Sequence, residues 1–241
     1  EILLATQRTA DSGPPKKVEI LHLHGDHYHG EGTISPDCPD LHGAGSNEQY
    51  SVFGCSNGIL IVHQDGDTFT AQHVDNATLG LGEGERVGSF DSHHELPQFV
   101  AYAGDRILII HPDHGDAEEL LWTEGAAVAL DSHALDGHGE HLILLDDSGD
   151  LRIIDTADWS EHAHVENAID PETAAPPASD HGSRVSMAVG GEPAQVFLSH
   201  ADSQSIIVVD VETGTLATPL SLSFPPGKLT WVGLSSEHGD H

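Results

Sequence analysis

Short apolar runs, rich in β-branched residues, recur along the chain and alternate with polar turns. Five such runs are "EILLAT" (1–6), "GILIVH" (58–63), "RILIIH" (106–111), "DLRIID" (150–155) and "SIIVVD" (205–210). Their starts lie 57, 48, 44 and 55 residues apart, close to the period of about 40–50 residues that is typical of propeller blades. The pattern predicts a repeated β unit, and it gives almost no support to helices.

A strand-like run and a polar turn precede four of the five runs, as in "QFVAYAGD" (98–105) and "HLILLDDSGD" (141–150). Further short runs follow or precede these hairpins, for example "TFTAQHV" (68–74) and "RVGSF" (86–90). We therefore predict an all-β protein, a β-propeller of four-stranded antiparallel blades with about five blade repeats. The alternative is a β-sandwich whose period is coincidental.

One domain over residues 1–241 accommodates these repeats, with two features set apart from the strands. The segment "HLHGDHYHG" (22–30) is predicted as a histidine-rich loop. The Pro- and Ala-rich stretch at 167–182 is predicted as an exposed linker between blades. The chain opens in the middle of a blade, which favours a ring whose first blades precede residue 1.

Acidic residues dominate the charge, with 40 Asp and Glu against 8 Lys and Arg and a formal net charge of −32. Such a chain repels phosphate backbones and anionic membranes, so nucleic acid is excluded as a partner. Solubility in an extracellular or high-salt medium is one explanation, and a field that concentrates cations is the other. The 20 histidines favour the second, because imidazole is the commonest metal-ligating side chain. No apolar run approaches the roughly 20 residues of a membrane helix, so we expect no membrane insertion.

The two cysteines, Cys38 and Cys55, each lie beside a turn-like element. Their spacing is neither the close pair of a zinc site nor the C-x-x-C of a redox site. We therefore predict a disulfide, which requires an oxidising compartment.

The segment at 22–30 holds four histidines and an aspartate in nine positions. In an extended backbone His22 and His24 share one face, and His27 and His29 share one face beyond the bend at Gly25. Together with Asp26 they supply enough nitrogen and oxygen ligands for zinc. A polar loop with incidental histidines remains the alternative, because no H-E-x-x-H spacing fixes the geometry.

A second set of histidines lies at predicted blade starts: His42, His93, His94 and His133. In a propeller these positions face the central channel, so histidines far apart in sequence can converge on a metal. For each one alone, a structural role is the alternative. We expect the 22–30 segment to be a weaker collecting site, and His42, His93 and His133 to belong to a tighter and more enclosed one.

The H-E-x-x-H motif and a phosphate-binding glycine loop are missing from the sequence. We therefore do not expect an enzyme. A metal-dependent hydrolase or lyase and a plain protein-interaction propeller stay as alternatives.

The elements "CPDLHGAG" (38–45) and "FGCSNGILIV" (53–62), beside the "HGDH" at 24–27, resemble the AztD-type periplasmic zinc metallochaperones. The resemblance covers residues 1 to about 234. Members of that family are longer β-propellers with a secretion signal, encoded with a zinc ABC transporter. The resemblance thus implies that this chain is the C-terminal part of such a protein.

The resemblance also implies a function and a location. It points to a disulfide between Cys38 and Cys55, with His42 close by, and to Zn²⁺ ligands among the histidine-rich segments. It implies a periplasmic or otherwise extracytoplasmic monomer that delivers zinc to the solute-binding protein of the transporter.

Overall fold

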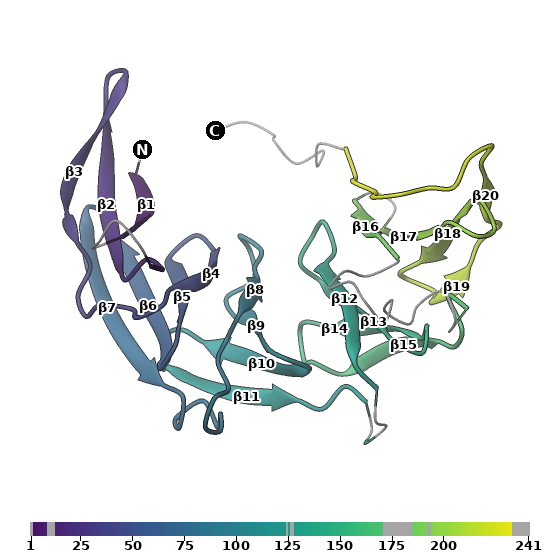
Figure 1. The fold of residues 1–241 in the computed structure, drawn as a ribbon, viewed down its shortest axis with the longest axis horizontal. Helices are drawn as coiled ribbons and strands as arrows, with labels where there is room; N and C mark the ends of the chain where they lie inside the picture. Colours follow the sequence, from purple (N-terminus) through teal and green to yellow (C-terminus); the bar gives the residue numbers. More distant parts are fainter. Residues whose placement is uncertain are drawn as a thin grey trace. The chain divides into compact units, whose positions relative to one another are not determined.

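The computed structural model consists of strands, turns and connecting segments, with no helix among the residues that it describes (Figure 1). These residues are 2–8, 13–123, 125, 128–170, 185–191 and 194–232. Nothing in this part of the chain is a helix long and apolar enough to cross a membrane. The chain divides into two compact units, Glu1–Leu120 and Leu121–His241.

The first unit contains three antiparallel sheets, and strands that are consecutive in sequence pair within each sheet. The first sheet consists of β1 (Ile2–Gln7), β2 (Lys17–His24) and β3 (His27–Thr33). The second consists of β4 (His42–Ser46), β5 (Tyr50–Cys55), β6 (Gly58–Asp65) and β7 (Thr68–Asp75). The third consists of β8 (Ser89–Asp91), β9 (Phe99–Ala103), β10 (Arg106–His111) and β11 (Asp116–Leu120).

The second unit contains two more antiparallel sheets. One consists of β12 (Leu130–Leu135), β13 (His141–Asp146), β14 (Leu151–Asp155) and β15 (Glu161–Val165). The other consists of β16 (Met187–Gly190), β17 (Gln195–His200), β18 (Ser205–Asp210), β19 (Thr215–Leu216) and β20 (Leu220–Ser221). Both β19 and β20 pair with β18. Among the described residues three of the five antiparallel sheets have four strands, which confirms the predicted all-β class and the blade pattern.

The five apolar runs lie in β1, β6, β10, β14 and β18. In the sheets of four or more strands the run is the third strand of its sheet, but β1 is not the equivalent strand of the first sheet. In the first sheet the equivalent strand is β2, which comes directly before the last strand, β3, just as β6 comes directly before β7 in the second sheet. The histidine-rich segment therefore belongs to the last two strands of the first sheet and is not the loop that the sequence predicts.

Two apolar cores hold the three sheets of the first unit together. One core joins the first sheet, through the fully buried Val18, to Leu60 and Val62 of β6. The other joins Ile59 and Ile61 of the same strand to the third sheet. Because successive side chains of a strand point to opposite faces, β6 serves both cores and reads as a continuous apolar run.

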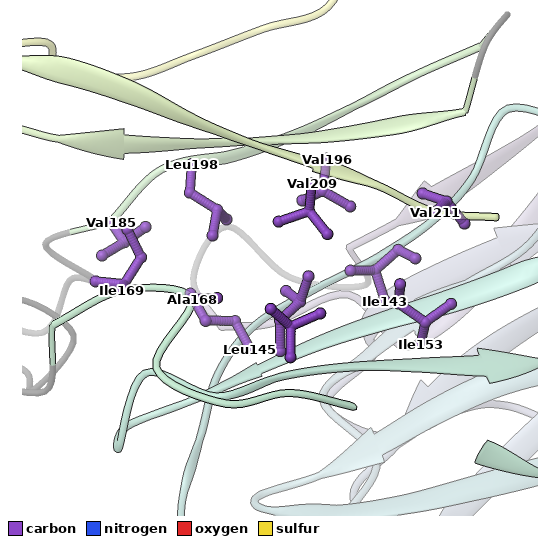
Figure 2. Close-up of a cluster of buried hydrophobic side chains, with 12 residues drawn as sticks. Ile143, Leu145, Ile153, Ala168, Ile169, Val185, Val196, Leu198, Val209 and Val211 are labelled. Carbon is purple, nitrogen blue, oxygen red and sulfur yellow. The ribbon is translucent and has the colours of Figure 1, made fainter. Parts of the chain in front are cut away.

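A third core lies between the two sheets of the second unit and includes Ile143, Leu145, Val196 and Val209 (Figure 2). The sequence predicts an exposed linker over 167–182, and its first residues contradict this. Ala168 and Ile169 are 5% and 1% exposed, and they belong to this core. Apolar side chains at the start of the segment fill the space between the sheets because their burial is favourable. Residues 171–182 lie outside the described part of the chain.

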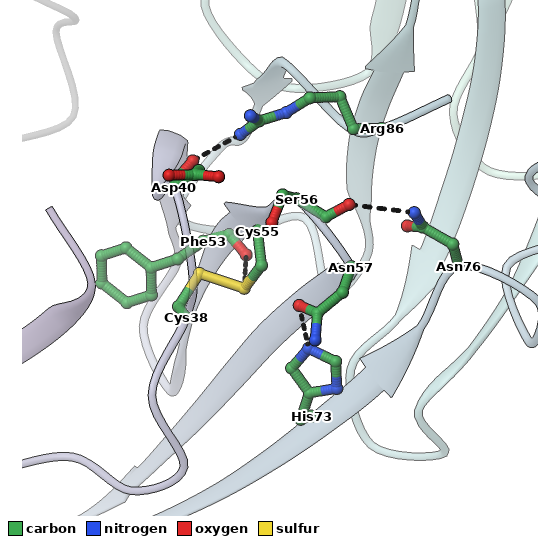
Figure 3. Close-up of a disulfide and its surroundings, with 9 residues drawn as sticks. All are labelled: Cys38, Asp40, Phe53, Cys55, Ser56, Asn57, His73, Asn76 and Arg86. Carbon is green, nitrogen blue, oxygen red and sulfur yellow. Dashed lines mark hydrogen bonds between the residues drawn. A yellow bond between two sulfur atoms is a disulfide. The ribbon is translucent and has the colours of Figure 1, made fainter. Parts of the chain in front are cut away.

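A disulfide joins Cys38 to Cys55 at the end of β5, as the sequence predicts (Figure 3). Both cysteines are fully buried. Cys38 belongs to the connection between β3 and β4, and its backbone N–H donates to the carbonyl of Lys16, 2.7 Å away and directly before β2. The disulfide thus fixes both the link between the first two sheets and the start of β2.

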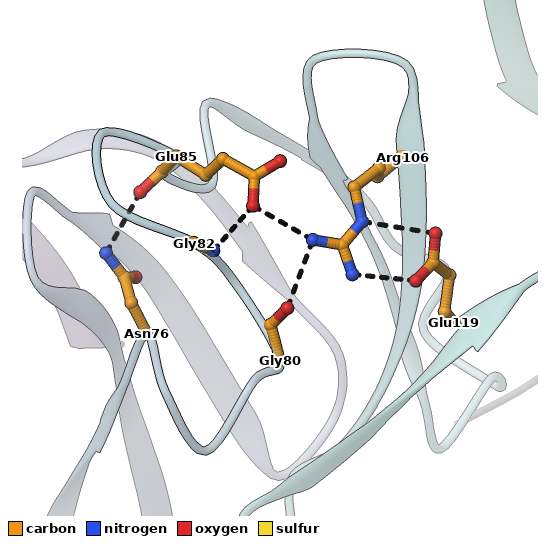
Figure 4. Close-up of polar contacts among 6 residues, drawn as sticks. All are labelled: Asn76, Gly80, Gly82, Glu85, Arg106 and Glu119. Atoms are coloured by element: carbon orange, nitrogen blue, oxygen red, sulfur yellow. Dashed lines mark hydrogen bonds and ion pairs between the residues drawn. The ribbon is translucent and has the colours of Figure 1, made fainter.

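Arg106 on β10 links the connection between β7 and β8 to β11 (Figure 4). Its guanidinium donates to both carboxylate oxygens of Glu119, at 3.1 and 2.7 Å, to Glu85 at 3.0 Å and to the Gly80 carbonyl at 3.1 Å. The hydrogen bond from Arg106 holds the pKa of Glu119 below its ordinary value.

We predict that Arg106→Gln lowers the free energy of unfolding by about 1–2 kcal/mol, because hydrogen bonds between charged groups are lost. Arg86→Gln is the control, because Arg86 donates one exposed hydrogen bond, to the Asp40 carbonyl at 2.7 Å, and the loss of that bond should cost less.

The contribution of the Arg106–Glu119 pair to stability should also depend on pH. Folding lowers the pKa of Glu119, so the pair stabilises the folded protein above the pKa of the unfolded carboxyl group, and this stabilisation disappears as pH falls through the lower pKa of the folded state. Urea unfolding at neutral and acidic pH measures both effects; equal losses for the two variants would contradict this assignment.

We predict that the double substitution Cys38→Ala/Cys55→Ala lowers the free energy of unfolding by about 3 kcal/mol. The two cysteines are 17 residues apart, and the disulfide restricts a loop of that size in the unfolded chain. Guanidinium unfolding of the double variant and of the non-reduced protein provides the comparison. Equal stability of the two proteins would show that the disulfide is dispensable for the first unit.

Candidate metal centre

The histidine-rich segment folds as a β-hairpin in which β2 and β3 are joined by the two residues Gly25 and Asp26. Gly25 adopts a φ of +67°, the left-handed conformation that two-residue hairpin turns require at their first position. The sequence predicts a loop over 22–30, whereas the structure pairs these residues in two strands. The first residue of β1 is opposite His22, so the end of the hairpin extends past β1 (Figure 1).

All four histidines of the hairpin lie on one face. His22 is directly opposite His29, and His24 is directly opposite His27. Residues that are opposite each other in a sheet share a face, as do residues two apart in one strand. The predicted sharing of a face by His22 and His24, and by His27 and His29, is confirmed. The structure adds that the two pairs share the same face.

The core of the first unit determines which face of β2 the histidines occupy. Val18 and Ile20 pack in the core between the first two sheets, and they lie on the same face of β2 as His22 and His24. A slip of one residue would expose Val18 and turn every histidine to the opposite face. Burial of these two apolar side chains therefore selects the register that presents the imidazoles together.

Glu31 joins this face through a β-bulge. Ile20 pairs with Gly32 and Leu21 pairs with Gly30, so Glu31 is an extra residue in β3. Bulges of this kind redirect a side chain and often lie next to functional sites. Glu31 was not among the ligands predicted from sequence. Two signals in the sequence could have found it: Glu31 continues the alternation of His27 and His29, and a glycine stands on each side of it.

His22, His24 and Glu31 form the set best placed to hold a metal ion. One ring nitrogen of each histidine and one carboxylate oxygen of Glu31 lie within 4.8 Å of one another. Among the described residues this is the one group of three His, Cys, Asp or Glu side chains that meets this distance. Nε2 of His24 is 3.9 Å from Oε1 of Glu31. Tetrahedral zinc needs ligand atoms about 3.3 Å apart, which small side-chain rotations can reach.

The other predicted ligands of the segment lie in the turn and at the start of β3. Nε2 of His27 is 3.0 Å from Nε2 of His29, and Nδ1 of His27 is 3.0 Å from Oδ1 of Asp26. The rings of His24 and His29 have centroids 5.1 Å apart, in an edge-to-face arrangement. The structure therefore brings the predicted ligands His22, His24, Asp26, His27 and His29 into one continuous surface.

The second predicted set is divided between the two units. His42 begins β4, and its Nδ1 donates to the Gly88 carbonyl at 3.0 Å, which leaves Nε2 as the acceptor nitrogen of the neutral ring. His93 and His94 follow β8, with ring centroids 4.2 Å apart. His133 lies on β12 in the second unit. Their shared role as ligands stays a prediction.

His94 also lines a pocket of about 210 Å³ in the first unit, together with Asn47, Glu48, Tyr50 and Glu95. Asn47 is held there by hydrogen bonds to the carbonyl of Leu96 and to the backbone N–H of Tyr50. The pocket is polar and acidic, but its side chains do not form a close group of ligands like that of the hairpin.

Comparison with known proteins gives a match in structure but none in sequence. No protein-family model matches the chain, and no curated protein matches its sequence. Two structures of AztD from Citrobacter koseri match with TM-scores of 0.70 (the apo form) and 0.72, at 16% and 18% identity, and they cover 95% and 99% of this chain. Sqt1 from Saccharomyces cerevisiae matches with a TM-score of 0.58, 13% identity and 90% coverage.

The chain is shorter than these proteins, since it spans 59–61% of the two AztD chains and 61% of Sqt1. The identities are too low to carry over functional residues, and the likeness is one of fold. The predicted resemblance to AztD-type proteins is thus confirmed at the level of architecture: the chain has the fold of AztD over nearly its whole length.

Proposed function

We propose that the protein binds Zn²⁺ on the β2–β3 hairpin and delivers it to a periplasmic solute-binding protein of a zinc ABC transporter. The observation that carries the proposal is the close approach of the half-buried His22 and the exposed His24 and Glu31 on one face of the hairpin. In this proposal zinc is cargo, and the protein is a carrier rather than an enzyme.

The chemistry of the ligand set suits transport of zinc. Imidazole nitrogen and carboxylate oxygen are its ordinary ligands, and three protein ligands leave a fourth position for water or for a group of another protein. Softer thiolate ligands are missing from the set, because both cysteines are in the disulfide. A site of this kind holds zinc but lets an incoming ligand enter before the ion leaves.

Two further observations support the proposed location and cargo. The disulfide is typical of proteins in oxidising compartments such as the periplasm. The net charge of −32 attracts cations and raises their concentration near the surface. The AztD-like fold favours a transporter's binding protein as the acceptor, on the resemblance described above.

We predict that His22→Ala/His24→Ala/Glu31→Ala removes one equivalent of bound zinc, because the three ligands of one position are lost. The matched control is His111→Ala/Glu118→Ala, which removes another His–Glu pair, 3.6 Å apart on β10 and β11. Titration against a competing chelator measures the number of sites and their affinities. Loss of the same equivalent in the control, or no loss in the hairpin variant, would contradict the proposal.

The same titration tests the second set of histidines. We expect the hairpin equivalent to be the weaker one, since the exposed strand β3 holds its side chains less firmly than a packed sheet does. His42→Ala or His133→Ala should then remove the tighter equivalent. If instead these variants keep the tighter zinc and the hairpin variant loses it, the two assignments are reversed.

We also predict that zinc leaves the protein as pH falls from about 7 to about 5. Imidazole must be neutral to coordinate a metal, so protons compete with zinc and occupancy decreases in acid. Equilibrium dialysis at a series of pH values, followed by metal analysis, gives the profile. Full occupancy at about pH 4.5 would rule out histidine ligation.

A further inference from the structure

The start of β3, directly after the turn, holds a second pair of close ligand atoms, apart from the set formed by His22, His24 and Glu31; we call His27 and His29 the tip pair. Nε2 of His27 and Nε2 of His29 are 3.0 Å apart, close to the separation of about 3.3 Å between two nitrogen ligands of one tetrahedral zinc. Both side chains lie on β3, all of whose residues are exposed.

Asp26 orients one of these two rings. Its Oδ1 is 3.0 Å from Nδ1 of His27, so the neutral ring donates from Nδ1 and keeps its lone pair on Nε2, which faces His29. A carboxylate behind a histidine, on the nitrogen away from the metal, is the usual arrangement at metal sites and raises the basicity of the ligand. Asp26 is therefore a positioning residue for His27.

The tip pair is also close to the first set. The ring centroids of His27 and His29 are 4.7 Å apart, those of His29 and His24 are 5.1 Å apart, and those of His24 and His22 are 5.5 Å apart. The four imidazoles thus form one group of neighbouring rings on one face, with His24 and His27 beside the turn and His22 and His29 one step farther from it.

We infer that the hairpin has two positions for one divalent cation: a resting position at His22, His24 and Glu31, and a transfer position at His27 and His29. This inference rests on the proposed function and adds the route of the ion. The transfer position has two protein ligands, so two tetrahedral sites stay open for imidazole or carboxylate groups of the acceptor. Zinc moves from the three protein ligands of the resting position to the two of the transfer position. Groups of the acceptor then complete the coordination of the zinc ion before His27 and His29 release it.

Nitrogen-15 NMR of the histidine side chains during a zinc titration identifies the positions directly. We expect His27 to be the Nδ1–H tautomer without metal, and zinc to shift the Nε2 signals of His22, His24, His27 and His29. If none of the four responds, the proposed function fails. If His22 and His24 respond and the tip pair does not, the proposed function stands and the transfer position is wrong.

The rate of transfer to a coloured pyridylazo chelator tests the role of the tip. We expect His27→Gln/His29→Gln to keep the affinity of the resting position and to slow transfer by about tenfold or more. His111→Gln is the control and should transfer at the wild-type rate. A wild-type rate in the tip variant, with zinc still bound at His22 and His24, would overturn the inference.

The role of Asp26 has its own test. Asp26→Asn should change the tautomer of His27 in the NMR spectrum and weaken zinc binding at the tip by about tenfold, whereas Asp26→Glu should restore both. An unchanged tautomer and affinity in Asp26→Asn would show that this carboxylate does not position His27.

Discussion

The packing of Val18 and Ile20 into the core between the first two sheets is the constraint on which the candidate site depends. Side chains alternate between the faces of a strand, so burying these two residues also decides where His22 and His24 point. The disulfide acts at the same place, because the backbone of Cys38 is hydrogen-bonded to the residue before β2. The position of the candidate metal-binding face is thus a consequence of apolar packing a few residues away.

The hairpin combines a fixed register with exposed side chains. Its backbone is paired along its length, while the residues of β3 are exposed and the imidazoles can rotate. A rigid frame with mobile ligands favours exchange over tight retention, since each ligand can leave without disturbing a packed core. The net charge of −32 adds a general attraction for cations, and in the proposed function the hairpin is the specific point of binding.

Much of the fold could be predicted from sequence because apolar runs and polar turns report directly on strands. The runs of β6, β10, β14 and β18 are buried on both sides and stand out for that reason. The disulfide followed from the spacing of two cysteines. By contrast, β2 was missed as a strand because its apolar residues are interrupted by polar ones and end in histidines, so it contains no continuous apolar run like that of β6.

The ligand set could be predicted only in part. Alternation showed which histidines share a face in each strand, but pairing of the strands in space decides that His22 is opposite His29. Glu31 enters the site through a bulge, and a bulge changes the register by one residue without a fixed sequence signature.

The most direct test of the account is a crystal structure of the zinc-loaded protein with anomalous data collected on both sides of the zinc absorption edge. The account predicts an anomalous peak between His22, His24 and Glu31, with ligand distances of about 2.0–2.2 Å. Anomalous peaks at other places only, with none on the β2–β3 hairpin, would contradict it.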